Sequence, residues 1–324
     1  MTSQPCAAAD AAAEGAAAAT TTFAALPPQL VSRIFELVPA DSRLRCREVH
    51  PSWRDALADP ALWARQDLSR AGGVERPFSA PLLYAAAARA SGRLEVLKVP
   101  VGGAVSPDAL LGVCRANAAT LTELSLDGSE FESATYLHVV NSCAQISAAL
   151  ASCTLTSVEL LNFDIWRVDR ALNTMTTALT AHPTLQSLSI FEDRPTESNR
   201  AARLGIALLL SEEYAICRKP RLQELHVDFY GDFTSARSLF TRLPRNTHLR
   251  AFTCVFKDSS VDDAAAEGFS RDVLLPAMRA TTSLQYVFTN LRCAEVREAM
   301  EFLQQRRAES NNVFVPRSKY AGQR

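Results

Sequence analysis

A short phrase of apolar residues recurs along most of the chain. Leucine or another mostly apolar residue stands at its first, fourth and sixth positions, which gives the frame LxxLxL. The last two of these positions alternate with period two, so each phrase predicts a short strand that buries both of them on one face. A related phrase begins at Leu94, and the frame follows at 121/124/126, 155/158/160, 185/188/190, 222/225/227, 249/252/254 and 284/287/289.

Helical periodicity fills the stretches between these phrases. Ser106-Pro107-Asp108 is typical of a helix start, because serine caps a first turn and proline suits its first position. Apolar residues then recur three or four positions apart within residues 110–114, 136–153, 168–179, 204–208, 236–243 and 296–303. Strand followed by helix, repeated, predicts an α/β fold made of one supersecondary unit stacked on itself.

Residues 26–68 follow a different pattern, which predicts short helices. Leu26-Pro27-Pro28 places a helix start near its last proline, since a residue before proline avoids the α region. Two apolar stripes follow, at 30/34/37 and 31/35/38, so the apolar face of this helix is wide. Pro39 ends it, and Asp41 can cap a second short helix that carries Leu44.

A third helix and a final turn complete this stretch. Val49, Trp53 and Ala56 form the apolar seam of the third helix, and Asp59-Pro60 predicts an N-cap followed by proline in the first turn. Fewer than about 40 residues rarely form a sufficient core alone. We therefore expect part of this apolar surface to be covered by something else.

The same stretch resembles an F-box. The chain matches the family pattern at Leu26, Pro27, Ile34, Phe35, Val49, Trp53, Asp59, Pro60, Leu62 and Trp63. It departs at His50-Pro51, where the family usually has Cys or Ser and then a basic residue. The resemblance implies a Skp-type adaptor as partner, contacted by Leu26, Pro27, Leu30, Ile34, Phe35, Val49 and Trp53. The alternative is an ordinary three-helix cap on a larger domain.

The later phrases resemble leucine-rich repeats over residues 94–314. Their starts lie 27, 34, 30, 37, 27 and 35 residues apart, whereas regular repeats take roughly 20 to 29. The Asn or Cys expected three residues after the last apolar position is replaced by Ser129, Phe163, Asp193 and Tyr230. The resemblance therefore implies a degenerate solenoid whose last edge strand is residues 312–315. A non-solenoid α/β domain stays open.

In a solenoid the strands line the inner, concave face, and residues between the apolar strand positions point out from it. Ser125 and Ser189 occupy two such positions. The others are candidate target contacts: Glu123, Asp127, Glu159, Phe191, Glu224, His226, Asp228, Tyr286 and Phe288. Aromatic anchors among carboxylates favour a basic segment on the partner. The alternative is a charged face that only keeps the solenoid soluble.

Composition narrows the compartment and the partners. A net charge of -1 and a pI near 6.5 disfavour nucleic acid or an anionic membrane as main partner. No apolar run approaches the roughly 18 residues of a membrane span, and the start lacks signal-peptide or transit-peptide features. Eight cysteines without paired spacing are typical of buried thiols in a reducing compartment. We expect a cytoplasmic or nuclear protein, or both.

Catalytic motifs are missing from the sequence. It contains no GxxxxGK[ST], GxGxxG or GxSxG. None of its five histidines lies at metal-ligand spacing from another histidine or from a cysteine. We therefore expect no enzyme activity, cofactor or metal. The F-box and repeat resemblances together imply the substrate-recognition subunit of a Skp-cullin-F-box type ubiquitin ligase. The alternative is a leucine-rich repeat scaffold, without ligase function, whose N-terminal helices form a cap.

These patterns divide the chain into five parts. Residues 1–22 are an alanine-rich tract that we expect to be disordered, because its helical face would carry nothing larger than methyl groups. The F-box is expected at 23–70, a linker with one helix at 71–93, the repeats at 94–315 and a tail at 316–324.

Overall fold

The computed structural model describes residues 26–68, 79–101, 105–129, 135–163, 169–191, 221–229, 233–256 and 263–309. The expectations for the tails 1–22 and 316–324, the helix at 204–208 and the strand at 312–315 lie outside these residues. The fold is mixed α/β, with a group of N-terminal helices followed by one parallel sheet of eight strands.

The N-terminal group consists of four short helical elements. They are α1 (Pro28–Leu37), α2 (Ala40–Val49), α3 (Pro51–Ala56) and the 3-10 helix η2 (Pro60–Trp63). Two sequence expectations need correction here. Asp41 lies inside α2 instead of capping it, because the helix begins directly after Pro39, and Val49 ends α2 instead of opening α3. His50 separates these two helices, and its Nδ1 accepts the Ser52 backbone N–H at 3.2 Å as the cap of α3.

The sheet begins within this segment and then follows the phrases. β1 (Arg65–Asp67), which the sequence pattern did not predict, pairs with β2. Every strand is parallel to the next, in the order of the sequence. The other strands are β2 (Val96–Pro100), β3 (Glu123–Asp127), β4 (Ser157–Leu161), β5 (Ser187–Phe191), β6 (Glu224–Phe229), β7 (Ala251–Phe256) and β8 (Tyr286–Thr289).

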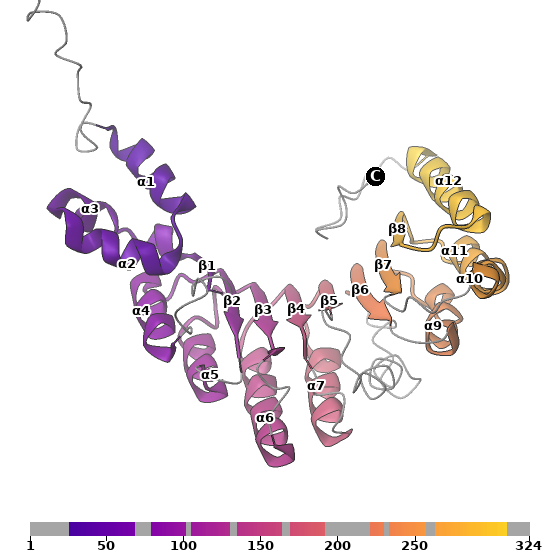
Figure 1. Ribbon diagram of the computed structural model, residues 1–324, viewed down its shortest axis with the longest axis horizontal. Coiled ribbons are helices and arrows are strands. Elements are labelled where there is room, and N and C mark those ends of the chain that lie inside the picture. Colours follow the sequence, from indigo (N-terminus) through magenta and orange to yellow (C-terminus); the bar gives the residue numbers. More distant parts are fainter. Residues whose placement is uncertain are drawn as a thin grey trace, which may run out of the picture.

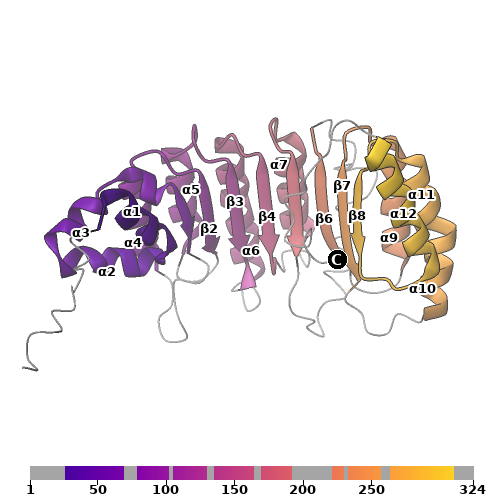
Figure 2. The ribbon, with the colours of Figure 1, turned by 90° about the horizontal axis from the view of Figure 1, so that it is seen from above.

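Helices cover one side of the sheet. Figure 1 shows the strands along the inside of an arc with the helices along its outside, and Figure 2 shows the strands side by side in chain order. The outer elements are α4 (Ala80–Ala90), α5 (Pro107–Ala116), α6 (Tyr136–Ser152), α7 (Asp169–Ala181), α9 (Phe233–Phe240), η7 (Leu243–Arg245), α10 (Asp263–Phe269), η8 (Ser270–Leu274), α11 (Leu275–Ala280) and α12 (Ala294–Glu309). Within the described ranges, no helix is both long and apolar enough to cross a membrane.

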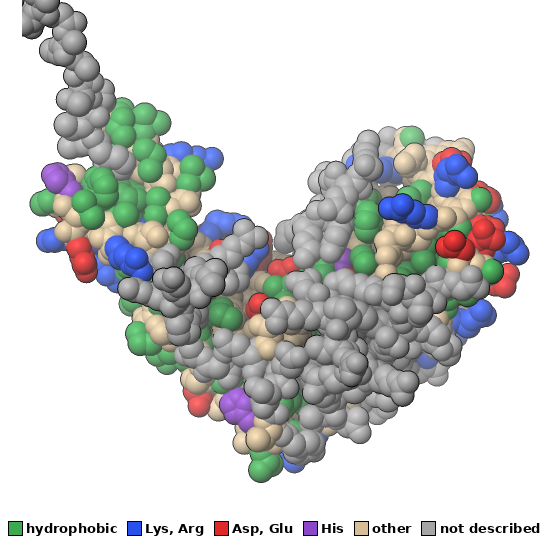
Figure 3. All heavy atoms as spheres, viewed as in Figure 1, with side chains coloured by type: hydrophobic (Ala, Val, Ile, Leu, Met, Phe, Trp, Pro, Cys, Tyr) green, Lys and Arg blue, Asp and Glu red, His purple; other side chains and the backbone are tan. Residues whose placement is uncertain are grey.

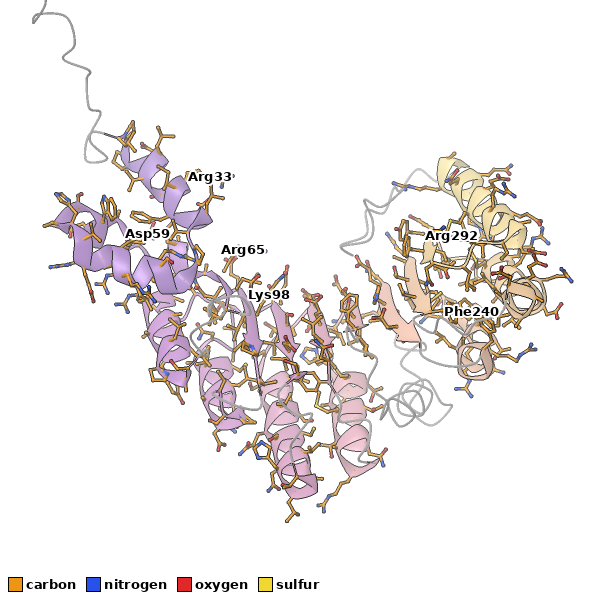
Figure 4. The ribbon with its side chains drawn as sticks, in the orientation of Figure 1. Arg33, Asp59, Arg65, Lys98, Phe240 and Arg292 are labelled. Carbon is orange, nitrogen blue, oxygen red and sulfur yellow. The ribbon has the colours of Figure 1, made fainter. Side chains whose placement is uncertain are left out.

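The core lies between the strands and the outer helices. The first leucine of each LxxLxL phrase is at most 1% exposed, and so are most of the fourth and sixth residues. Towards the C-terminus phenylalanine rings also pack in this core. The ring of Phe240 on α9 lies edge-on to Phe252 of β7 at 5.2 Å between centroids, and Phe233 stacks on Phe269 at 4.5 Å; Phe240 is labelled in Figure 4.

Hydroxyl groups join consecutive strand-and-helix units at the phrase starts. The Oγ1 of Thr120 donates to the Leu94 carbonyl at 2.9 Å, and that of Thr184 donates to the Leu155 carbonyl at 2.7 Å. Ser283 donates in the same way to the carbonyl of Asn246 at 3.2 Å. Each donor directly precedes the first leucine of its phrase. These bonds satisfy carbonyls that would otherwise lose water on burial.

Trp63 fastens the N-terminal helices to the sheet region. Its side chain is fully buried, and its Nε1–H donates to the Leu57 carbonyl at 3.0 Å. The guanidinium of Arg43 from α2 lies 5.1 Å from the ring centroid, and that of Arg89 from α4 lies 5.5 Å away. Arg43 also donates to the Leu62 carbonyl, and its burial lowers the pKa of its guanidinium by desolvation. The tryptophan is thus held by cation–π contacts from both regions.

Candidate binding surfaces

An apolar surface remains exposed on the N-terminal helices. Val31 and Phe35 of α1 point into the molecule and are buried. Leu30, Ile34 and Leu37 form the other stripe of the same helix, with exposed fractions of 52%, 39% and 81%. Figure 3 shows hydrophobic side chains gathered over these helices, at the upper left. A helix with apolar residues on both faces presents one face to its own core and leaves the other for a partner.

This exposure is concentrated in one part of the described chain. Its large hydrophobic residues with more than a third of their surface exposed are Leu30, Ile34, Leu37, Val49, Tyr84 and Leu137. Four of these six lie on α1 and α2, whereas Tyr84 and Leu137 stand on separate outer helices. Single exposed apolar residues are common on protein surfaces, but a group of four on two neighbouring short helices is a candidate interface.

The structure places the seven predicted adaptor contacts in different environments. Leu30, Ile34 and Val49 are exposed, as is Pro27, while Leu26 and Trp53 are half-buried against the core. Phe35 is a correction. It is only 2% exposed because its ring packs edge-on against Trp53 at 5.9 Å, so it lies in the core of the helices and is not part of the exposed surface.

Leu37 was missing from the predicted contacts although it is the most exposed of the group. The signal was present in the sequence, since Leu37 continues the stripe of Leu30 and Ile34 at i+7. Its exposure follows from its place at the C-terminal end of α1, where Val38 leaves the helix in an extended conformation.

A second surface is the inner face of the sheet. The strand register aligns side chains from successive strands into rows that cross the sheet. One row contains, in strand order from β1 to β8, Asp67, Lys98, Ser125, Glu159, Ser189, His226, Thr253 and Phe288. Residues two positions earlier form a parallel row on the same face, because side chains alternate along each strand. Lys98 and Arg65, which sequence reasoning missed, bring positive charge to this face next to the N-terminal helices (Figure 4).

Four of the nine predicted target contacts are buried, which corrects the expectation that all of them are exposed. Phe191, Glu224, His226 and Asp228 have exposed fractions of 8% or less. Three of them contact one another: the His226 ring lies 4.0 Å from that of Phe191, and its Nε2 bonds Asp228 Oδ1 at 3.0 Å. Glu224 accepts a hydrogen bond from Ser187 at 3.4 Å. Long polar side chains next to each other in a curved sheet cover their neighbours, and single-strand alternation cannot predict this.

The other five predicted target contacts stay half-exposed at the inner face. They are Glu123, Asp127, Glu159, Tyr286 and Phe288. Glu123 faces Arg65 at 3.9 Å, and Asp127 accepts the backbone N–H of Ser129 at 3.0 Å. The structure therefore keeps carboxylates on β3 and β4 and aromatic rings on β8 within reach of a partner. Among the described residues, no group of His, Cys, Asp and Glu is arranged to hold a metal ion.

Comparison with known families shows which family the N-terminal helices resemble. Residues 23–69 match the F-box-like family, so this segment is an F-box-like domain. The matched segment contains α1 to β1 and with them the exposed stripe of Leu30, Ile34 and Leu37. The search of curated proteins gave no match. The family match ends before β2, and the assignment of the sheet to leucine-rich repeats therefore stays a prediction.

Proposed function

We propose that the chain is the substrate-recognition subunit of a Skp-cullin-F-box type ubiquitin ligase. The observation that supports this most is the exposed stripe of Leu30, Ile34 and Leu37 within an F-box-like domain. F-box domains typically bind Skp-type adaptors. Each large apolar side chain that becomes fully buried contributes about 1.5–3 kcal/mol, so three or four can offset the several kcal/mol that association costs.

We further propose that the sheet region is a degenerate leucine-rich repeat solenoid. Its strands are parallel and follow chain order, each phrase leucine is buried under the outer helices, and each unit contacts its neighbours in the sequence. These are the features expected of a solenoid, in which one strand-and-helix unit cannot bury its apolar face alone. The long outer helices, such as the 17-residue α6, account for repeat spacings beyond the usual range.

In this proposal the inner face holds the target protein while the F-box-like domain holds the ligase. The subunit contributes no acid, base, nucleophile or cofactor to ubiquitin transfer, and it is not an enzyme by itself. It raises the effective concentration of the target near a charged ubiquitin-conjugating enzyme, which for a well-matched tether reaches about the mM range. The proposed compartment is the cytoplasm, the nucleus or both.

Adaptor binding by the full chain tests this function. The tagged chain is co-expressed with a Skp-type adaptor, and the amount of co-purified adaptor is measured for wild type, Ile34→Asp and Leu37→Asp. A carboxylate in an apolar contact loses its water without gaining a partner, so both variants should lose most of the adaptor. Leu137→Asp is the matched control, because Leu137 is 70% exposed on α6 and belongs to another surface. Undiminished adaptor with both α1 variants would contradict the proposal.

A scaffold without ligase function is the second candidate, and the contacts of the N-terminal helices favour it. β1 extends the sheet from within the F-box-like segment, and Trp63 is held by Arg89 of α4, so these helices also cover the first end of the sheet. The same contacts make the full chain the proper test object, since an isolated segment would lose them. A wild-type chain that binds no Skp-type adaptor would favour the scaffold.

A further inference from the structure

A polar hollow lies on the inner face over β2 to β5. Its volume is about 250 Å³, and Lys98, Glu123, Ser125, Glu159 and Ser189 are among the residues that line it. Small serine side chains on three neighbouring strands leave this space open, while the longer charged side chains stand beside them. The site is therefore large enough for one or two side chains of a bound peptide.

Three residues of one row across the hollow carry polar groups that no described residue satisfies. Lys98, Ser125 and Glu159 are register neighbours on β2, β3 and β4. In the described part of the chain, none of their side chains forms a hydrogen bond or an ion pair. Ser125 lines the hollow and is only 6% exposed as a residue, and its hydroxyl has no hydrogen-bond partner in the described chain. A hydroxyl in such a recess can gain a hydrogen bond from a ligand that enters it.

The charges in this row also select the ligand. Lys98 is a cation at the β2 side, Glu159 is an anion at the β4 side, and both are half-buried. Glu159 stands between Ser125 and Ser189, which surround it with further hydrogen-bond acceptors. A guanidinium presents five N–H donors in a plane and matches such a set better than an ammonium does. The row is thus complementary to an acidic side chain at one end and an arginine at the other.

We infer that the hollow binds an extended target segment in which an acidic residue and an arginine stand two or three positions apart. The inference rests on the proposed function, since it names the kind of target that the inner face would hold. Lys98 and Glu159 are two strand spacings apart, about 9.6 Å at the backbone. Three residues of a polyproline II chain span about 9.3 Å and return to the same face, which matches this distance. Two residues of a β-strand span about 6.7 Å, and the long side chains of Lys98 and of the arginine in the segment can bridge the remaining distance of about 3 Å.

A phosphorylated segment fits this hollow less well. Its phosphate would meet Lys98, but Glu123 and Glu159 line the same space and would repel it. Arg65, the nearest further cation on this face that the register places beside β2, already faces Glu123 at 3.9 Å. The balance of charges in the hollow thus favours a segment that carries both signs over one that carries a phosphate.

Selection from a displayed library of random peptides tests the inference with the full-length chain. Wild type is compared with Glu159→Lys and Lys98→Glu, with folding checked by circular dichroism. The control reversals are Glu267→Lys on α10 and Arg115→Glu on α5, both exposed on the outer layer. Wild type and both controls should enrich peptides with arginine two or three positions from Asp or Glu. Glu159→Lys should lose the arginine, and Lys98→Glu should replace the acidic residue by a basic one.

Affinity measurements then give the size of the effect. A labelled synthetic peptide of the wild-type consensus should bind Glu159→Lys at least about tenfold more weakly, because the reversal removes one partly desolvated charge pair and adds repulsion of the peptide's arginine. Enrichment of uncharged peptides, of phosphate mimics with several acidic residues and no arginine, or of one consensus by all variants would overturn the inference. Adaptor co-purification is measured on the same preparations. If the peptide selection fails while adaptor still co-purifies with the chain, the inference about the hollow is wrong and the proposed function stands. If no adaptor co-purifies with the wild-type chain, the proposed function is wrong.

Discussion

Leucine has opposite fates in the two regions of this molecule. In the sheet region Leu188 is completely buried, because β4 and β6 flank its strand and helices cover it. On α1 the side chain of Leu37 is 81% exposed, because this helix packs only its Val31 and Phe35 side inward. Residue type alone therefore does not determine burial. What matters is how many elements surround a position, and short helices at one end of a molecule are surrounded on one side only.

The unsatisfied groups of the two regions also differ in kind. The F-box-like domain leaves apolar side chains exposed, whereas the inner face of the sheet leaves a cation, an anion and a serine hydroxyl without partners in the described chain. Apolar burial is non-directional and rewards any complementary shape, while charge rows select a partner by sign and spacing. The two proposed interfaces therefore require partners of different chemistry.

The largest effect is expected from a substitution of Trp63, which connects the two regions. Trp63→Ala removes a fully buried ring that Arg43 and Arg89 hold from opposite regions, and it should lower the free energy of unfolding by about 3–5 kcal/mol. Urea denaturation followed by circular dichroism measures this. Trp63→Phe retains much of the packing and should cost clearly less. An equal loss in both variants would mean that the indole N–H and its bond to Leu57, not the ring volume, dominate.

The same substitution in both regions tests the comparison directly. Leu188→Ala should destabilise the chain by about 2–5 kcal/mol, because it leaves a cavity in the core. Leu37→Ala should change stability by less than about 0.5 kcal/mol, because its side chain is already in water. Denaturation of the two variants side by side provides the measurement. A large loss with Leu37→Ala would show that α1 is packed within the chain and not left for a partner.

The sequence predicted most strands and helices because their signals are local. Each LxxLxL phrase became a strand that starts two residues after its first leucine, as at β3 and Leu121. The helical segment 263–280 was missed, since Gly268 and Pro276 interrupt its pattern. The structure accommodates the proline with a π-helical turn, in which Leu275 N–H bonds the Ser270 carbonyl. A threonine or serine directly precedes the first leucine of several phrases, as Thr120 does before Leu121, and this further sign of a repeat was not used in the prediction.

The candidate surfaces were predicted less completely, because exposure depends on neighbours distant in sequence. The stripe of Leu30 and Ile34 was recognised, but the pattern could not tell that Phe35 would turn inward against Trp53. On the sheet, alternation gave the correct face for His226 and Asp228, yet it could not show that the two bond each other within β6 and that Phe191 of β5 packs against His226. Lys98 was overlooked although the frame marks its position, because it lies between Leu97 and Val99 of the first phrase.

Buried thiols give a third, smaller contrast between the regions. Cys143 and Cys254 of the sheet region are completely buried, and desolvation raises the pKa of each thiol to about 12, whereas Cys46 of the N-terminal helices is half-buried. An unfolded cysteine ionises near pH 8.5, so above that pH the unfolded chain binds fewer protons than the folded one and stability falls. At pH 10 the loss should be about 1–2 kcal/mol per thiol. Below pH 8 these thiols should have no effect.

Denaturation at pH 7.5 and pH 10 measures this loss, and Cys143→Ala isolates one thiol. The variant should lose less stability between the two pH values than wild type does, whatever its stability at pH 7.5. Identical losses in wild type and variant would show that Cys143 is accessible to water in the folded chain. Cys254→Ala provides an independent repeat of the experiment at the other end of the sheet.

The smallest expected effect separates the two interfaces by their response to salt. Raising the ionic strength from about 0.05 to 0.5 M shortens the screening length to several Å, so half-exposed charge pairs lose up to about 1 kcal/mol. The selected peptide should therefore dissociate several-fold more readily from the hollow, because Lys98 and Glu159 attract it by charge. Adaptor affinity should change by less than about twofold or increase, since the Leu30, Ile34 and Leu37 stripe binds by apolar burial. Both affinities are measured on one preparation by fluorescence anisotropy. If the affinity of the adaptor falls with salt while that of the peptide does not, the assignment of charge attraction to the hollow and of apolar burial to the F-box-like domain is wrong.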